Sequence, residues 1–318
     1  MLDSFWAGLG GKLSDRWAAL LFTPAFAFWA GGWITWLSHT HRRQISHGGW
    51  AEAIKQALSP LTGLPVLVQG VLLAGLLLGV TASALLIQNL TLPVLRLLQG
   101  YWPGWLIWAR GPLTRHRTSQ IGTLRERLRD LEARRPGTLD AKTMAKYLQL
   151  DRKYQRVPPA SSQHMPTRLG NILQAFESRP AVRYGLNTEL CWPRLWMLLP
   201  DGAKQEITEA RSRLSFAAQV WIWGVLFTVW TAWAWWALPV GILTAILAYL
   251  RMLTVAAVYG ELLESCFDVH RHLLYTALRW PLPTTPAEEH QQGTELTIYL
   301  RRGSTAGKPA FTPPQSSG

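Results

Sequence analysis

The feature that most constrains the fold is a set of four long apolar runs at residues 17–37, 64–88, 214–238 and 240–259. The first three carry no charge, and the fourth carries only Arg251. A helix needs about 20 apolar residues to cross the roughly 30 Å hydrocarbon core of a bilayer, because each residue rises about 1.5 Å. Uncharged runs of this length are rare outside lipid, so the sequence predicts four transmembrane helices.

The composition agrees with a membrane protein. Hydrophobic residues make up 48% of the chain and charged residues only 16%, against about 25% charged residues in soluble globular proteins. This composition excludes an intrinsically disordered chain and a collagen-like one. The two cysteines, Cys191 and Cys266, exclude a disulfide-rich secreted scaffold.

The first run is interpreted as an anchor that stays in the protein. It is longer than the roughly 7–15 apolar residues of a signal peptide, and Ser38-His39-Thr40-His41 after it offers no small-residue cleavage site.

The distribution of Lys and Arg predicts the orientation. Residues 110–213 contain 20 Lys and Arg against 10 Asp and Glu, in a chain of formal net charge +13. Basic segments stay on the cytoplasmic side, so this segment and both termini are expected inside the cell. The uncharged stretch 238–241 has room only for a turn, which predicts a tight hairpin with its tip outside.

The charge of one loop disagrees with this topology. Residues 38–63 contain Arg42, Arg43 and Lys55 against Glu52 alone, yet four crossings place the loop outside. If the loop were inside, an extra crossing would be needed at residues 91–108.

Two features in and after the second run concern helix packing. Residues 89–109, which include several of the 18 Trp residues, read either as a stretch lying on the cytoplasmic leaflet or as a loop packed on the soluble domain. Gly75, Gly79 and Ser83 form a ridge of small residues that permits close helix approach, within the chain's own bundle or in a dimer.

The basic segment is expected to be helical. Ile121, Leu124, Leu128 and Leu131 mark one helical face, which predicts an amphipathic helix packed on a second helix at residues 140–156. The apolar stretch 192–199 is too short to cross and is expected to lie against the membrane surface. A last helix from Asp201 is expected to continue into the third crossing.

The predicted fold class is therefore an all-α membrane protein with four transmembrane helices and a helical cytoplasmic domain inserted between helices two and three. The predicted divisions are a cytoplasmic N-terminus (1–16), the first crossing (17–37), an external loop (38–63), the second crossing (64–88), an interfacial segment (89–109), the basic domain (110–213), the third (214–238) and fourth (240–259) crossings, a helical extension (260–280) and a largely disordered tail (281–318). Within the tail, residues 296–300 are expected to add an edge strand or to pack on the domain.

Several strings of residues recur together elsewhere. The strings PTRLGN, RYG, WPRLW, LLP, YGELLESCFDVHRHLLYTALRWPLP and LTIYLRRG, over about half the chain, resemble segments of uncharacterised multi-pass membrane proteins of bacteria. The resemblance implies a protein of the bacterial inner membrane. It implies no activity and no catalytic residue.

No enzyme motif is recognised. Gly8-Leu9-Gly10-Gly11-Lys12 lacks the Gly six positions before the Lys and the Ser or Thr after it that a phosphate-binding loop needs. HExxH, CxxC and GxSxG are absent from the sequence. We therefore predict no catalytic residue, cofactor or metal.

Acidic residues after the fourth run form a candidate binding site. Glu261, Glu264, Asp268 and His272 share one helix face because they are spaced by three or four residues. They are able to bind a metal only with ligands from another helix. The preferred interpretation is ion pairing with basic residues of the cytoplasmic segment, Arg168, Arg183 or Arg194.

Arg251 is a second candidate, because a guanidinium within a membrane span costs about 2.5–3.5 kcal/mol unless it is paired or reaches the interface. It is expected to bind backbone carbonyls, Gln69, Thr228 or Thr231, to lie close to one interface because the fourth span is shifted, or to bind a substrate or lipid headgroup. The cluster of His39, His41 and His47 is interpreted as part of a solvated loop.

The favoured function is an integral membrane anchor that presents the basic helical domain to a protein partner or to anionic lipid, with lipid headgroups near Arg110, Arg115 and Arg117. The alternatives are a small-solute transporter or channel subunit that acts as a homo-oligomer, and a membrane enzyme that uses the acids after the fourth run. Nucleic acid is not expected as a partner, because the basic segment lacks a base-reading motif.

Overall fold

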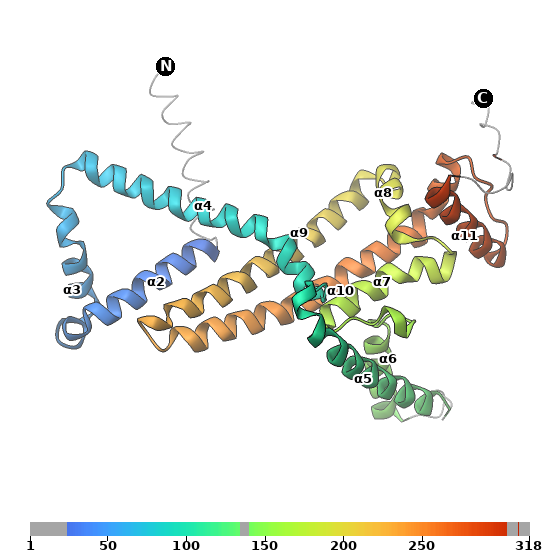
Figure 1. Cartoon of the computed structure of the whole chain (residues 1–318), viewed down its shortest axis with the longest axis horizontal. Coiled ribbons are helices and arrows are strands. Elements are labelled where there is room, and N and C mark those ends of the chain that lie inside the picture. The colour runs from blue at the N-terminus through green and yellow to red at the C-terminus, as the bar shows by residue number, and fades with distance from the viewer. Residues whose placement is uncertain (1–23, 134–139, 304–310, 312–318) are drawn as a thin grey trace, which may run out of the picture. The chain divides into compact units, whose positions relative to one another are not determined.

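The computed structural model describes residues 24–133, 140–303 and 311, and every regular element in these residues is a helix. The α-helices are α2 (Pro24–Thr40), α3 (Arg42–Thr62), α4 (Val66–Gln99), α5 (Ile107–Ala133), α6 (Ala141–Tyr154), α7 (Arg168–Tyr184), α8 (Thr188–Leu198), α9 (Asp201–Phe227), α10 (Ala237–Ala277) and α11 (Pro286–Arg302) (Figure 1). Short 3-10 turns occur at η1 (Gly104–Leu106), η3 (Ser161–Gln163) and η4 (Thr228–Ala232). The predicted all-helical class is confirmed for the described residues.

Among the described residues, three helices are long and apolar enough to cross a membrane: α4, α9 continued through η4, and α10. They contain most of the second and third apolar runs and all of the fourth. The predicted N-terminus (1–16) and residues 17–23 of the first run lie outside the described residues, and the rest of that run lies in α2.

The chain divides into two compact units, and the division falls within α4, α9 and α10. One unit contains residues 1–95 and 215–251, and the other contains residues 96–214 and 252–318. We call the first the apolar unit and the second the basic unit.

The core of the apolar unit consists of small, aliphatic and aromatic side chains: Ala25, Val80, Ile87, Ile222 and Trp223. Helix α2 packs on aromatic rings of the α9 segment through two glycines. A Cβ on Gly31 would lie 2.4 Å from the ring of Phe227, and one on Gly32 would lie 2.3 Å from the ring of Trp230. Only glycine permits this approach without moving the rings.

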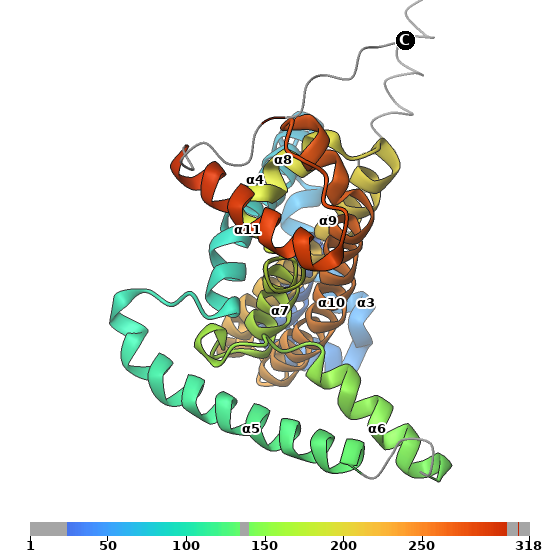
Figure 2. The same cartoon turned by 90° about the vertical axis from the view of Figure 1, so that its right-hand side faces the viewer.

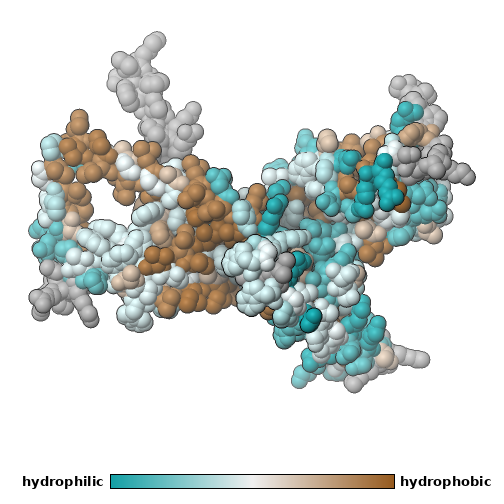
Figure 3. Space-filling view, viewed as in Figure 1, coloured by the Kyte–Doolittle hydropathy of each residue, from teal (hydrophilic) through white to brown (hydrophobic). Residues whose placement is uncertain are grey.

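Helix α4 exposes most of its apolar side chains. Val66, Leu67 and Leu78 are 83%, 77% and 70% exposed, and hydrophobic residues cover this helix in Figure 3. None of the described residues lies within 4 Å of a Cβ placed on Gly75 or Gly79, so this part of the small-residue ridge does not pack within the described chain. A lipid environment or another helix is required to cover such a surface.

The predicted turn between the third and fourth runs is wrong in position. Residues 238–241 belong to α10, and the chain turns at residues 233–236 instead. Pro239 lies in the first turn of α10, where a missing backbone N–H costs no helical hydrogen bond. Gly241 serves close packing, since its Cβ would lie 2.8 Å from the carbonyl oxygen of Gly224 in α9.

The segments predicted as an external loop and as an interfacial segment are largely helical. Most of the predicted external loop (38–63) forms α3, which has a kink at Gly49, where φ is +76°. Residues 89–99 of the predicted interfacial segment continue α4, with Pro93 inside the helix, and the remainder contains a turn and η1.

Around α8 the basic unit has a compact core. It includes Leu186, Cys191, Leu195, Phe267 and Leu296, all less than 1% exposed. The stretch 192–199, expected on the membrane surface, belongs largely to α8, and Trp192 and Trp196 pack partly buried against this core. One side of the stretch is buried within the protein, whereas Met197 is 71% exposed, so contact of that side with the membrane stays a prediction.

The tail expected to be largely disordered contains α11, which packs against α7 and α8 (Figure 2). Residues 296–300 are helical rather than an edge strand. Thr285 caps the helix by accepting a hydrogen bond from the backbone N–H of Glu288, and Pro286 occupies the first turn. The segment is polar, so its sequence did not indicate a helix, and α11 buries only a narrow stripe that includes Leu296 and Gly293. The last dozen residues, apart from Phe311, lie outside the described residues.

The string PTRLGN is explained by the start of α7. Thr167 caps the helix by accepting a hydrogen bond from Gly170 N at 3.0 Å and donates one to the carbonyl oxygen of Gln99 at 2.9 Å. The side chain of Asn171 bonds the backbone N–H and carbonyl of Met165, each at 2.8 Å. A Cβ on Gly170 would lie 1.9 Å from the Gln99 oxygen, so the string fixes α7 against the end of α4.

The string RYGLN closes α7 and opens α8. Gly185 has φ +70° and ends α7, and the side chain of Asn187 accepts a hydrogen bond from Leu190 N to cap α8. Thr297 of α11 donates to the carbonyl oxygen of Gly185 at 2.9 Å. Polar contacts therefore fix α7, α8 and α11 together.

Helices α5 and α6 pack on each other. The predicted amphipathic helix corresponds to α5, which begins earlier than expected, at Ile107, and buries Leu128. The predicted second helix (140–156) corresponds to α6. Arg125 of α5 donates to the hydroxyl of Tyr154 in α6 at 2.9 Å.

Candidate functional site

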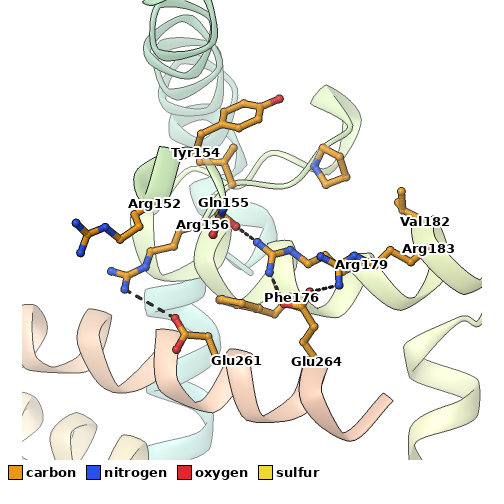
Figure 4. A pocket seen from close by; sticks show the side chains of 12 residues that line it. Arg152, Tyr154, Gln155, Arg156, Phe176, Arg179, Val182, Arg183, Glu261 and Glu264 are labelled. Atoms are coloured by element: carbon orange, nitrogen blue, oxygen red, sulfur yellow. Dashed lines mark hydrogen bonds and ion pairs between the residues drawn. The ribbon is translucent and has the colours of Figure 1, made fainter. Parts of the chain in front are cut away.

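The acidic face after the fourth apolar run meets α7 within the basic unit. Glu264 of α10, whose side chain is only 12% exposed, forms ion pairs with Arg179 and Arg183 of α7 (Figure 4). Arg183 Nη1 lies 2.8 Å from Oε1 of Glu264. Two guanidinium groups on one largely buried carboxylate offset its desolvation through charge-assisted hydrogen bonds.

Asp268 and Glu261 continue this face with weaker ion pairs. Arg183 Nη1 lies 3.7 Å from Oδ2 of Asp268, and Oδ1 of the same carboxylate accepts a hydrogen bond from the hydroxyl of Tyr184 at 2.6 Å. Glu261 lies 4.0 Å from Arg156, and both side chains are well exposed. Exposed pairs of this kind contribute little to stability.

Arg179 connects three elements of the basic unit. Besides Glu264 it bonds the carbonyl oxygen of Gln155, at the end of α6, and its guanidinium lies 4.5 Å from the ring centroid of Phe176. The Phe176 ring in turn packs on Gly260 of α10, where a Cβ would lie 2.1 Å from the ring. The acidic face is therefore part of the contact between α6, α7 and α10.

The predicted partners of these acids are right for Arg183 only. Arg194 bonds the carbonyl oxygen of Leu190 in its own helix, and Arg168 forms no ion pair with the acids among the described residues. Arg179 and Arg156 were missed. The signal for Arg179 was its spacing of four from Arg183, which matches the spacing of four between Glu264 and Asp268 on the facing helix.

A further ion pair ties α10 to α11. Arg271 Nε lies 2.5 Å from Oε1 of Glu289, and its guanidinium lies 4.2 Å from the ring centroid of Tyr184. His272, which was grouped with the acids, is exposed, and its Nδ1 lies 3.1 Å from the carbonyl oxygen of Val269. Within the described residues, no group of three or more His, Cys, Asp and Glu side chains is arranged to hold a metal ion.

Arg251 is exposed on α10. The contacts expected for it do not form in the structure: Gln69 donates to the carbonyls of Leu61 and Leu64, and Thr228 to that of Val225. Contact of Arg251 with a substrate or headgroup stays a prediction.

Helix α6 carries a strongly basic surface, which we call the α6 basic face. It lines an open hollow of about 650 Å³ with five cationic side chains and no acidic one: Lys142, Lys146, Arg152, Lys153 and Arg156. Of these cations only Arg156 has an ion pair among the described residues, the exposed one with Glu261. Net positive charge in such a face is available to an external anion.

A second hollow lies where α5, the end of α6 and the start of α7 meet, and we call it the α5–α7 pocket. It has a volume of about 360 Å³. Its lining includes four cationic side chains, Arg117, Lys153, Arg156 and Arg168, and five aliphatic ones, Ile121, Leu124, Val157, Ile172 and Leu253. The pocket joins the α6 basic face through Lys153 and Arg156, which line both.

Comparison of the chain with protein-family models, with curated proteins and with solved structures found no match.

Proposed function

We propose that the chain is an integral protein of the bacterial inner membrane that crosses the bilayer four times and presents a basic helical domain to an anionic partner on the cytoplasmic side. The α6 basic face carries this proposal: five cations line one hollow without a carboxylate, and four of them lack an ion pair within the described residues. Mutual repulsion of such charges destabilises the folded chain, so an external anion that binds them is stabilising.

The exposed apolar surface of α4 supports the membrane part of the proposal, since leaving side chains such as Leu67 and Leu78 in water is costly. The excess of Lys and Arg in residues 110–213 supports the cytoplasmic placement. The enzyme alternative loses support because Glu264 and Asp268, its proposed acids, are held by arginines.

Reporter fusions test the topology. Fusions after Gly63, Pro158 and Ala234 lie at a helix junction, in the segment between α6 and α7, and in the α9–α10 turn. They are expected to read outside, inside and outside. An inside signal at Gly63 would contradict four crossings and favour the extra crossing at residues 91–108.

Lysine acylation in native membrane vesicles tests the anionic partner. Lys142, Lys146 and Lys153 are expected to be protected at low salt and to become reactive at high salt, because salt screens exposed charge pairs. Lys204, which has its own ion pair with Asp201 in α9, provides the comparison within the same chain and should change less. Reactivity of the α6 lysines that is the same at both salt concentrations would contradict the proposal.

A further inference from the structure

The α5–α7 pocket combines two chemical characters in one small hollow. Arg117, Lys153, Arg156 and Arg168 contribute positive charge, and Ile121, Leu124, Val157, Ile172 and Leu253 contribute an aliphatic lining. The only other lining residues are Gln120 and Asn171. A ligand that satisfies the whole pocket must therefore be both anionic and apolar.

The charges around this pocket are not neutralised within the described residues. Arg117 Nη1 donates to the side-chain oxygen of Gln120 at 2.8 Å, which is a neutral partner. Lys153 and Arg168 form no ion pair with any described residue. Arg156 has only a long, exposed pair, with Glu261 at 4.0 Å. An anion that enters the pocket gains up to four charge-assisted contacts.

The local backbone adds to this positive field. Arg168 is the first residue of α7, and Asn171 lies in its first turn. The N-terminal end of a helix carries partial positive charge and favours anions. Thr167 and Asn171 hold this end of α7 in place through their hydrogen bonds with Gln99, Gly170 and Met165, so the arginine at its start is presented from a fixed backbone.

We propose that the α5–α7 pocket binds a membrane phospholipid whose headgroup carries at least two negative charges, with its phosphates on the cationic side chains and the start of an acyl chain on the aliphatic lining. Four cations exceed the single charge of an ordinary phosphodiester, which favours a headgroup with two phosphates or a phosphomonoester. Basic pockets on the cytoplasmic side of membrane proteins commonly hold such lipids. This inference rests on the proposed function, because it requires the basic domain to reach the membrane surface.

The test uses the full chain in a mild non-ionic detergent and measures binding by native mass spectrometry. The probes are short-chain diphosphatidylglycerol, phosphatidylcholine of the same chain length, and inorganic phosphate. The wild type is expected to bind diphosphatidylglycerol at least about tenfold more tightly than the other two, since one charge-assisted hydrogen bond is worth about a factor of ten or more.

Matched variants locate the site. Lys153→Gln/Arg168→Gln removes two exposed cations of the pocket and should weaken diphosphatidylglycerol binding by about a hundredfold, whereas Arg301→Gln/Arg302→Gln, at the exposed end of α11, should leave it unchanged. Ile121→Ser removes part of the aliphatic lining and should weaken lipid binding without changing phosphate binding. A thermal melt of each variant without ligand shows that the fold is retained.

Three outcomes would overturn the inference: equal binding of the two lipids, equal loss in both charge variants, or phosphate binding as tight as lipid binding with lipid binding unchanged by Ile121→Ser. If lipid binding fails while Lys142 and Lys146 remain salt-sensitively protected in native membranes, the basic face has a protein partner, and the proposed function stands without this lipid site. If the protection of Lys142 and Lys146 is absent as well, both the lipid site and the proposed function fail.

Discussion

The apolar unit and the basic unit use different means to hold helices together. In the apolar unit, helices meet through glycines and aromatic rings, as at Gly31 and Gly32 of α2. The basic unit also has such a contact, between Gly260 and Phe176, but adds hydrogen bonds and ion pairs between helices, such as those of Thr167 and Glu264.

The difference follows from the solvent that each unit requires. Lipid gives no hydrophobic drive for helices to associate, so close packing of small residues must supply it. Water gives that drive but leaves the register of helices undecided, and buried polar contacts fix it, because each is satisfied in only one arrangement. The two units should therefore respond differently to the same kind of substitution.

The largest expected effect is that of Gly170→Ala in the basic unit. The new Cβ would lie 1.9 Å from the backbone oxygen of Gln99, and backbone cannot move aside without breaking the contact between α7 and the end of α4. We expect a loss of at least about 3 kcal/mol in the free energy of unfolding. The measurement is thermal melting in detergent.

Gly202→Ala is the matched control for this substitution. Gly202 lies in the first turn of α9, and nothing lies within 4 Å of its Cβ position, so this variant should gain about 0.5–1 kcal/mol through reduced chain entropy. If Gly170→Ala melts like the control, the PTRLGN string does not fix α7 as described.

The next effect is that of Glu264→Gln. The substitution leaves Arg179 and Arg183 without the carboxylate that neutralises them, and Arg179 is only 19% exposed. We expect a loss of about 2–3 kcal/mol, below the range for fully buried pairs because Arg183 is half exposed. Glu261→Gln should cost less than about 0.5 kcal/mol, since its pair is long and exposed.

Melting in the presence of Zn²⁺ or Mn²⁺ distinguishes the ion-pair interpretation of Glu264 from a metal site. The melting temperature of the wild type should not change with either ion, because arginines occupy Glu264 and Asp268. A metal-dependent rise that Glu264→Gln or His272→Ala abolishes would replace the ion-pair interpretation with a metal site.

A smaller effect is expected for Gly32→Ala in the apolar unit. The new Cβ would lie 2.3 Å from the ring of Trp230, and a side-chain ring can shift where backbone cannot. We expect a loss of about 1–2 kcal/mol, with Gly79→Ala, whose Cβ position is open, close to the wild type. A loss in Gly32→Ala as large as that in Gly170→Ala would remove the contrast between the units.

The helical class and the long apolar helices were predictable because they depend on run length and charge, which the sequence displays directly. The acidic stripe on α10 was predictable for the same reason, since Glu264 and Asp268 share a face by spacing alone. Which arginine each acid meets was not, because it depends on where α7 crosses α10. Arg168 and Arg183 lie at opposite ends of α7, and only Arg183 reaches the stripe.

The errors concern segments whose composition is compatible with two structures. Pro239 and Gly241 are typical of a turn, yet proline also suits a first helical turn and glycine also suits a close helix crossing. The polar segment that forms α11 lacks an apolar run, and its helix depends on contacts with α7 and α8 that a sequence does not display. The α5–α7 pocket was missed because its cations come from three separate helices.

The smallest effect concerns the pH dependence of the basic unit at His164. Partial burial lowers the pKa of His164 below its ordinary value of 6.5, and the nearby charge of Arg125 acts in the same direction. In the unfolded chain the imidazole takes up its proton at a higher pH than in the folded chain, so stability should fall as pH falls from 6.5 through the folded pKa and should level off below it.

Nδ1 of His164 lies 3.1 Å from the hydroxyl of Thr118, so Thr118→Ser, which keeps the hydroxyl, should retain this slope. His164→Gln removes the titrating group and should flatten it, which melting curves across this pH window measure. A slope that is identical in His164→Gln and in the wild type would assign the acid sensitivity of the basic unit to its carboxylates, with the Glu264 ion pairs as the first to examine.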